Sequence, residues 1–186
     1  EGDMQTAIFH HQKAIEICPS DTYHIARYSI LLCYLGKPEE GLEEITRAMR
    51  LDPFCSDILF EAQGLSFYCL DKPADALASF KKMQIDSIAS LFYQALCYQA
   101  LDDGENARAY LDMAMSDSGM DVEKFVSTQL YVNDKFKSRL KNSLANIPSV
   151  NLWLRKINPN LQKMLIVSRA NGIGVNVERL RDDRLP

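Results

Sequence analysis

The chain has 186 residues, of which 47% are hydrophobic and 25% are charged, and its formal net charge is −4. This composition excludes an intrinsically disordered protein and is typical of a globular domain with a packed core. The longest apolar run, around Ile30 to Leu35, is far shorter than the ~20 residues that cross a bilayer, so we expect no membrane insertion.

A spacing pattern recurs along residues 1–119. Between Gly36 and Pro53, the steps between successive small or apolar positions are five, four, three and five residues. The same steps recur upstream, and the first three recur twice downstream without the closing proline. The four copies are Gly2, Ala7, His11, Ala14, Pro19; Gly36, Gly41, Ile45, Ala48, Pro53; Asp71, Ala76, Phe80, Met83; and Asp102, Ala107, Leu111, Ala114. A fixed period of this kind indicates an array of repeated units.

Each unit is expected to be a pair of helices. The residues before each copy supply the first helix, where a small residue stands beside a large one, as in Gly64 and Phe67. The small positions let neighbouring helices approach closely, and the larger ones fill the remaining space. Gly36, Asp71 and Asp102 are expected in the turns between paired helices, and Pro19 and Pro53 are expected to end second helices.

The pattern resembles that of the tetratricopeptide repeat family, which has a small residue in the first helix, a small-large-small run in the second and a closing proline. The resemblance implies an all-α, right-handed superhelix of antiparallel helix pairs over residues 1–119. It also implies a non-catalytic protein–protein interaction module. Gly2 occupies a turn with no first helix before it, so we expect an excised fragment with a truncated first repeat. The missing first helix would leave an apolar face at the N-terminus, and this face would permit a homodimer.

Residues 120–186 are expected to continue the same solenoid. Asp121 and Asp134 are the predicted N-caps of a divergent helix pair, and Pro159 begins a predicted closing helix that ends at Gly172. The stretch from Leu161 to Gly174 is loosely similar to the helix that follows such repeats in bacterial class III adenylate/guanylate cyclases and some transcriptional regulators. An alternative function is therefore a regulatory segment of a larger signalling enzyme or transcription regulator.

No catalytic, cofactor or metal site is predicted, so we do not expect an enzyme. Gly172 and Gly174 lack the strand, third glycine and lysine of a phosphate-binding loop. His10 and His11 are adjacent on a helix and diverge by about 100°, so they cannot chelate one ion together. The paired glutamates that begin at Glu39 are expected to face solvent near a helix N-terminus.

The resemblance implies that first helices line a concave groove, and this groove is the predicted binding site. We expect an apolar partner helix or an extended peptide to bind its aromatic wall. Alanine at Tyr68 and Tyr93 is expected to abolish binding without unfolding. The alternative is that these side chains belong to the core or lie under the C-terminal segment. The predicted partner-binding residues are Tyr23, Arg27, Tyr34, Glu61, Leu65, Tyr68, Phe92 and Tyr93.

Three partner and location expectations complete the prediction. Members of this family that bind acidic chaperone tails use a clamp of Lys, Asn and Arg, of which the groove offers only Arg27, so a chaperone-tail site is not expected. Residues 121–186 are basic whereas residues 1–120 are acidic, but no nucleic-acid module accompanies the basic residues, and we expect no nucleic acid. The five unpatterned cysteines favour a reducing, cytoplasmic setting.

Overall fold

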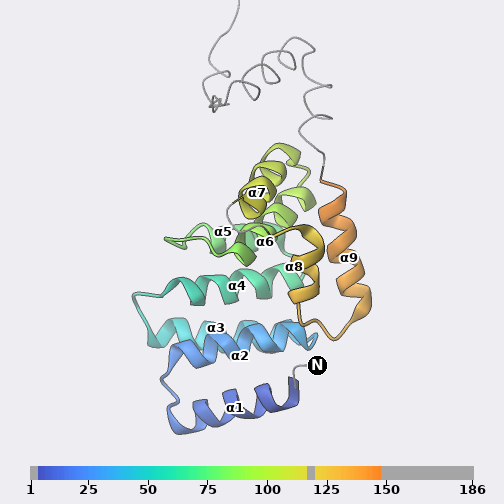
Figure 1. Ribbon diagram of the computed structural model, residues 1–186. Coiled ribbons are helices and arrows are strands. Elements are labelled where there is room, and N and C mark those ends of the chain that lie inside the picture. The colour runs from blue at the N-terminus through green and yellow to red at the C-terminus, as the bar shows by residue number, and fades with distance from the viewer. Residues whose placement is uncertain (1–3, 117–119, 148–186) are drawn as a thin grey trace, which may run out of the picture. The chain divides into compact units, whose positions relative to one another are not determined.

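The computed structural model describes residues 4–116 and 120–147, and within them every regular element is an α-helix (Figure 1). The all-α prediction is confirmed for this part of the chain. The predicted closing helix beyond Pro148 and the glycines at 172 and 174 lie outside the described residues. The helices are α1 (Met4–Ile17), α2 (Thr22–Tyr34), α3 (Pro38–Leu51), α4 (Asp57–Cys69), α5 (Pro73–Phe80), α6 (Ile88–Ala100), α7 (Gly104–Ser116), α8 (Val122–Thr128) and α9 (Asp134–Ala145).

The helices pack as successive pairs. Helix α2 packs on α3, α4 on α5, and α6 on α7, while α1 packs on α2 and α8 on α9. Neighbouring pairs meet where α4 contacts α2 and α3, and where α6 contacts α4 and α5. Figure 1 shows the connections α1–α2, α3–α4 and α5–α6 on one side of this stack. The pairs coincide with the repeat units predicted from the sequence, and α1 corresponds to the second helix of the first unit.

The turns inside the three complete pairs share one backbone conformation. Gly36, Asp71 and Asp102 have φ values of 78°, 55° and 59°, in the left-handed region. In each turn the next residue donates its N–H to the carbonyl five residues back: Lys37 to Leu32, Lys72 to Phe67 and Asp103 to Tyr98. This is the Schellman arrangement, which satisfies carbonyls at the end of the first helix. The predicted turn positions are therefore confirmed.

Substitutions at two of these turns should change stability in opposite directions. A Cβ on Gly36 would meet nothing within 4 Å, so Gly36→Ala should lower the free energy of unfolding by about 1 kcal/mol through backbone strain alone. Asp102→Gly should raise it by about 0.5 kcal/mol, because glycine relieves the strain but gains freedom in the unfolded chain. Urea unfolding of the two variants measures both effects, and equal effects of the same sign would contradict this explanation.

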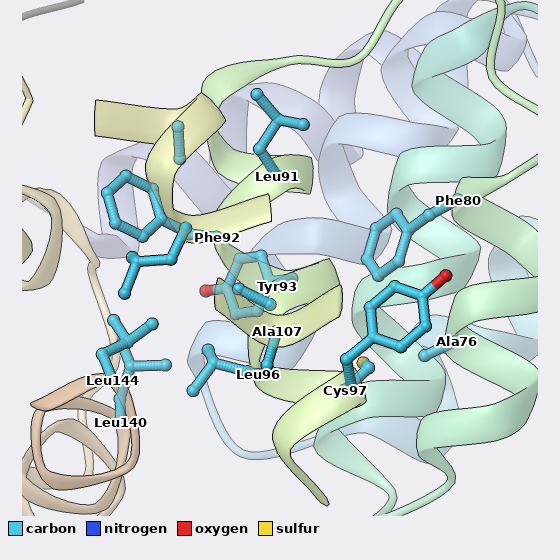
Figure 2. Close-up of a cluster of buried hydrophobic side chains, with 14 of the residues drawn as sticks. Ala76, Phe80, Leu91, Phe92, Tyr93, Leu96, Cys97, Ala107, Leu140 and Leu144 are labelled. Atoms are coloured by element: carbon cyan, nitrogen blue, oxygen red, sulfur yellow. The ribbon is translucent and has the colours of Figure 1, made fainter. Parts of the chain in front are cut away.

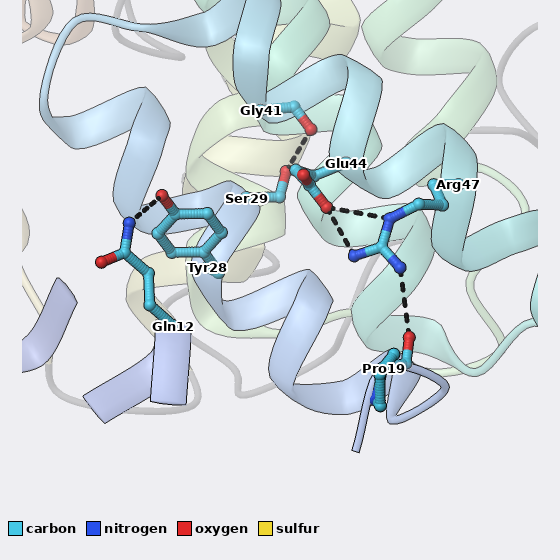
Figure 3. Close-up of polar contacts among 7 residues, drawn as sticks. All are labelled: Gln12, Pro19, Tyr28, Ser29, Gly41, Glu44 and Arg47. Atoms are coloured by element: carbon cyan, nitrogen blue, oxygen red, sulfur yellow. Dashed lines mark hydrogen bonds and ion pairs between the residues drawn. The ribbon is translucent and has the colours of Figure 1, made fainter. Parts of the chain in front are cut away.

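Small residues bring α2 and α3 into close contact. A Cβ on Gly41 would lie 2.9 Å from the carbonyl oxygen of Ser29, and the Ser29 hydroxyl donates to the Gly41 carbonyl at 2.7 Å. Figure 3 shows this bond beside a second link, in which Arg47 donates to Glu44 and, at 3.1 Å, to the carbonyl of Pro19. The second link ties α3 to the connection between α1 and α2.

The largest hydrophobic cluster extends from α2 to α9. Figure 2 shows Phe80 of α5, Phe92 and Leu96 of α6, and Leu140 and Leu144 of α9 among its buried members. A second cluster, formed by α2, α3 and α4, contains Ile25, Ala26, Ile45, Ala48, Leu59 and Ala62. Predicted packing positions of the three later copies, such as Ile45, Phe80 and Leu111, are buried in these clusters, whereas Ala7, His11 and Ala14 of α1 are only partly buried. The C-terminal pair is therefore part of the core of residues 4–147.

The caps of the C-terminal pair differ in part from the prediction. Asp121 caps α8 as predicted, by accepting the N–H of Lys124 at 2.8 Å. The cap of α9 is Asn133, which accepts the N–H of Lys135 at 2.9 Å, so the prediction of Asp134 was wrong by one residue. Asp134 lies instead in the first turn, where its negative charge interacts favourably with the helix dipole.

Candidate functional site

The predicted groove residues lie on one face of each first helix. On α2 this face contains Tyr23, Arg27 and Tyr34, which are separated by helical steps. On α4 the corresponding face contains Glu61, Leu65 and Tyr68, and on α6 it contains Phe92 and Tyr93. Because α2 packs against α4 and α4 against α6, these faces adjoin. We call the surface that they form the first-helix wall.

Helix α8 covers the part of this wall that α6 supplies. The ring of Phe125 stacks on Phe92 at a centroid distance of 4.0 Å and lies edge-on to Tyr93 at 5.7 Å. Phe92 and Tyr93 are completely or almost completely buried, as is Phe125 itself. The structure thus places two predicted binding residues in the core, in contact with the C-terminal pair.

An extended segment, residues 129–132, lies on the wall between α8 and α9. Its side chains alternate: Gln129 and Tyr131 are 5% and 4% exposed, whereas Leu130 and Val132 are 52% and 63% exposed. The N–H of Val132 donates to the carbonyl of Tyr34 at 3.0 Å. Alternation of this kind is what an extended chain gives when one side faces a protein surface.

Hydrogen bonds of the tyrosines hold the segment in place. The hydroxyls of Tyr34 and Tyr93 donate to Oε1 of Gln129 at 3.2 and 2.8 Å. The hydroxyls of Tyr93 and Tyr131 are 3.0 Å apart. Burial raises the pKa of Tyr34 to about 12 and the pKa of Tyr93 well above its ordinary value, so both phenols remain neutral donors at physiological pH.

The C-terminal end of α4 is also covered. The ring of Tyr68 lies 5.1 Å from that of Tyr93 and 6.1 Å from that of Phe136 in α9, and Leu65 is buried. Arg139 of α9 forms a salt bridge with Asp71, at the turn after α4. Tyr34, Leu65, Tyr68, Phe92 and Tyr93 therefore all lie in the core or under residues 122–147, which is the alternative that the sequence left open.

In the part of the chain that the structure describes, the N-terminal halves of α2 and α4 are not covered on this side. Tyr23 and Arg27 are exposed, and Glu61 is half-buried. The hydroxyl of Ser87 donates to a carboxylate oxygen of Glu61 at 3.0 Å. Burial raises the pKa of Glu61, while the Ser87 bond and the positive charge of Arg27 act in the opposite direction. This open end therefore presents an aromatic ring, a cation and a hydrogen-bond acceptor.

The sequence did not identify Gln129 and Tyr131 as residues of this surface. Phe125 lies within the predicted divergent helix pair, but it was not predicted to contact this surface. The sequence signal for an extended segment was weak, because residues 129–132 contain only two repeats of the alternation between a side chain with a polar group and an aliphatic one. Their partners, Tyr34 and Tyr93, are 95 and 36 residues away from Gln129 in the chain, and no local pattern reports such contacts.

Two histidines meet where α1 packs on α2. The rings of His11 and His24 are 5.9 Å apart, and Nδ1 of His24 lies 3.0 Å from a carboxylate oxygen of Asp21. Nδ1 of His11 is buried without a hydrogen-bond partner. Within residues 4–116 and 120–147, no group of three or more His, Cys, Asp or Glu side chains could hold a metal ion. The histidine pair is a ring contact between α1 and α2.

The contact between α1 and α2 should weaken in mild acid. Burial, with the nearby charges of His24, Arg27 and His10, lowers the pKa of His11 below its ordinary 6.5. A histidine with a lowered pKa binds a proton more tightly in the unfolded chain, so its contribution to stability is complete above pH 6.5 and falls as the pH drops below it. Urea unfolding at pH 7.5 and 5.5 should show a smaller pH-dependent loss for His11→Gln than for the wild type. An equal loss would contradict the assignment to His11.

The basic residues of the C-terminal pair are partly neutralised within the chain. Besides the Arg139 salt bridge, Nζ of Lys141 lies 2.7 Å from a carboxylate oxygen of Glu123.

Helices long and apolar enough to cross a membrane are absent from the described ranges.

Comparison with known proteins adds no family to this description. No protein-family model matches the chain, and no curated protein matches it. The functional interpretation therefore depends on the first-helix wall: which part of it the chain itself occupies, and which part remains open.

Proposed function

We propose that the chain is a non-catalytic protein–protein interaction module, built as a tetratricopeptide-like right-handed superhelix with a divergent C-terminal cap. Its partner is a protein segment that binds the open end of the first-helix wall, around Tyr23, Arg27 and Glu61. A reducing, cytoplasmic setting fits the free, buried thiols of Cys33 and Cys97.

The observation that carries this proposal is the binding of residues 129–132 on the same wall. There the wall holds an extended chain by packing against aromatic rings, by tyrosine hydroxyls and by one backbone hydrogen bond. The ring of Tyr131 meets that of Tyr34 edge-on at 4.8 Å. Recognition of an extended peptide by another protein uses the same combination of contacts.

The open end of the wall indicates the chemistry of the partner. Tyr23 offers an exposed ring for an apolar side chain, Arg27 donates hydrogen bonds, and Glu61 accepts them. A few convergent polar groups beside an apolar contact fix the direction in which a peptide lies. We therefore favour an extended segment with one apolar anchor flanked by polar residues over a fully apolar helix.

Burial of the aromatic residues changes the mutational test predicted from the sequence. Tyr93 is 2% exposed and belongs to the core, so its replacement by alanine removes packing and two hydrogen bonds. Such truncations of buried aromatic residues cost about 3–5 kcal/mol. Tyr93→Ala would therefore disturb the fold and cannot report on binding alone.

A groove variant and a matched control test the proposal. Tyr23→Ala with Arg27→Glu removes the exposed contacts of the wall, whereas Met113→Ala removes a comparably exposed apolar side chain from α7. A protein that binds to the immobilised wild type is purified. Its dissociation constant is then measured for the wild type, the groove variant and the control. We expect at least a tenfold weaker dissociation constant for the groove variant and an unchanged one for the control. Equal affinities for the three proteins would reject the open wall as the binding site.

A further inference from the structure

Two histidine side chains from neighbouring repeats meet where α1 packs on α2. The ring centres of His11 and His24 are 5.9 Å apart, and the ring planes are inclined by 56°. A Zn–N bond is about 2.0–2.1 Å long and a ring nitrogen lies about 1.2 Å from the ring centre, so two imidazoles on one ion have centres about 5 to 6.5 Å apart. The two rings therefore have the separation that a shared metal ion requires.

Asp21 determines which nitrogen of His24 is free. Nδ1 of His24 lies 3.0 Å from a carboxylate oxygen of Asp21. A carboxylate only accepts hydrogen bonds, so Nδ1 donates and Nε2 of the neutral ring keeps its lone pair. Hydrogen bonds from the backbone and the ring of His24 lower the pKa of Asp21, so the carboxylate stays negative at neutral pH. A carboxylate in this position is the usual outer partner of a histidine that binds a metal.

His11 has a nitrogen without a partner. Within residues 4–116 and 120–147, Nδ1 of His11 is buried and forms no hydrogen bond. Buried polar atoms are nearly always paired, and an unpaired one calls for a specific explanation. Burial, more than the nearby positive charges, lowers the pKa of His11, so its ring is neutral at pH 7 and offers a lone pair. A metal ion bound to Nδ1 would supply the missing partner.

The site is accessible from solvent, and opposite charges act on it. The side chains of His24 and Asp21 are 39% and 36% exposed, so an ion can enter from their side. The negative charge of Asp21 favours a bound cation, whereas the positive charge of Arg27, which acts on His11, opposes it. Two protein ligands leave the other positions of a tetrahedral ion to water, so binding is weaker than at a structural site with four protein ligands.

We propose that His11 and His24 bind one Zn²⁺ ion between α1 and α2, with water in the remaining positions. Imidazole is a ligand that suits Zn²⁺. The ion links the first two repeats at α1, a helix in which no residue is fully buried. An ion that binds only the folded pair stabilises it, so zinc holds α1 on α2. This inference does not depend on the proposed partner site.

Calorimetric titration of the full chain with Zn²⁺, under reducing conditions, tests the proposal. The wild type should bind one ion that requires both histidines, and His11→Gln and His24→Gln should each weaken the dissociation constant by at least about tenfold. Asp21→Asn keeps a residue that caps α2 but removes the charge, so it should weaken binding by about tenfold without unfolding the helix. Zn²⁺ should also slow hydrogen exchange in α1 of the wild type but not of His24→Gln.

Two control variants separate this site from other zinc ligands of the chain. His10→Gln changes an exposed neighbour of His11 that diverges from it by about 100° on the helix. Cys18→Ser removes an exposed thiol from the connection between α1 and α2. Both variants should bind Zn²⁺ as the wild type does, and loss of binding in Cys18→Ser would assign the ion to the thiol instead. A wild type that binds no Zn²⁺ would overturn the proposal, as would equal affinities of the wild type and His24→Gln.

Discussion

Gly64→Ala should lower the free energy of unfolding by about 2–3 kcal/mol. A Cβ at this position of α4 would lie 2.5 to 2.7 Å from three ring atoms of Phe80, which is 1% exposed. The ring is enclosed by the core, so α4 and α5 must move apart or Phe80 must leave its rotamer. Overpacking of this kind is destabilising by about 1–3 kcal/mol, and here the contact is with a rigid aromatic ring. Urea unfolding of the variant measures the loss.

Two further variants isolate the contact between Gly64 and Phe80. Gly104→Ala changes a glycine at the start of α7 where a Cβ meets nothing within 4 Å, so it should be neutral or stabilising by up to about 1 kcal/mol. In the Gly64→Ala background, Phe80→Leu should recover part of the lost stability, because the smaller side chain gives the Cβ room. Strict additivity of the two changes would show that the loss has another origin.

Phe125→Ala should lower the free energy of unfolding by about 3–4 kcal/mol and loosen residues 122–147 before the rest of the chain. The Phe125 ring is 2% exposed and contacts Phe92 and Tyr93, and its removal leaves a cavity between α8 and α6. Hydrogen exchange should show faster exchange in α8, α9 and residues 129–132 at denaturant concentrations where α4 and α5 remain protected.

The matched control for Phe125 is Leu130, which lies five residues further along the chain. Leu130 is half-exposed, so Leu130→Ala should change stability by less than about 0.5 kcal/mol and leave exchange in α9 as it is. If Phe125→Ala raised exchange uniformly over all the helices, the C-terminal pair would not be a separately opening part of the fold.

The sequence predicted the helix pairs well because their determinants are local. Gly36, Asp71 and Asp102 are found in left-handed turns, and Ile45, Phe80 and Leu111 are found between helices, as their spacing required. A period in the sequence reports which residues face a neighbouring helix, since the neighbour is another copy of the same unit. The helix pairs therefore followed from spacing alone.

The surface of the first helices could not be predicted in the same way. Its aromatic residues satisfy the pattern of a binding wall and the pattern of a core equally well, and the difference depends on what lies against them. At Tyr34 that neighbour is Gln129, in a segment outside the repeat pattern. Residues that contact a non-repeating part of the chain have no periodic signal, so the open and covered ends of the wall were not separable from sequence.

The hydrogen bond between Val132 and Tyr34 has a consequence for how the protein unfolds. Residues 129–139 contact α2 at Tyr34, the α4 turn at Asp71 and α6 at Tyr93, which are three different repeats. A linear array in which each repeat contacts only its neighbours can lose its ends one unit at a time. Here the C-terminal segment links three units, so helices α2 to α7 should melt in one cooperative transition. Helix α1, none of whose residues is fully buried, lies outside that linkage and should fray first.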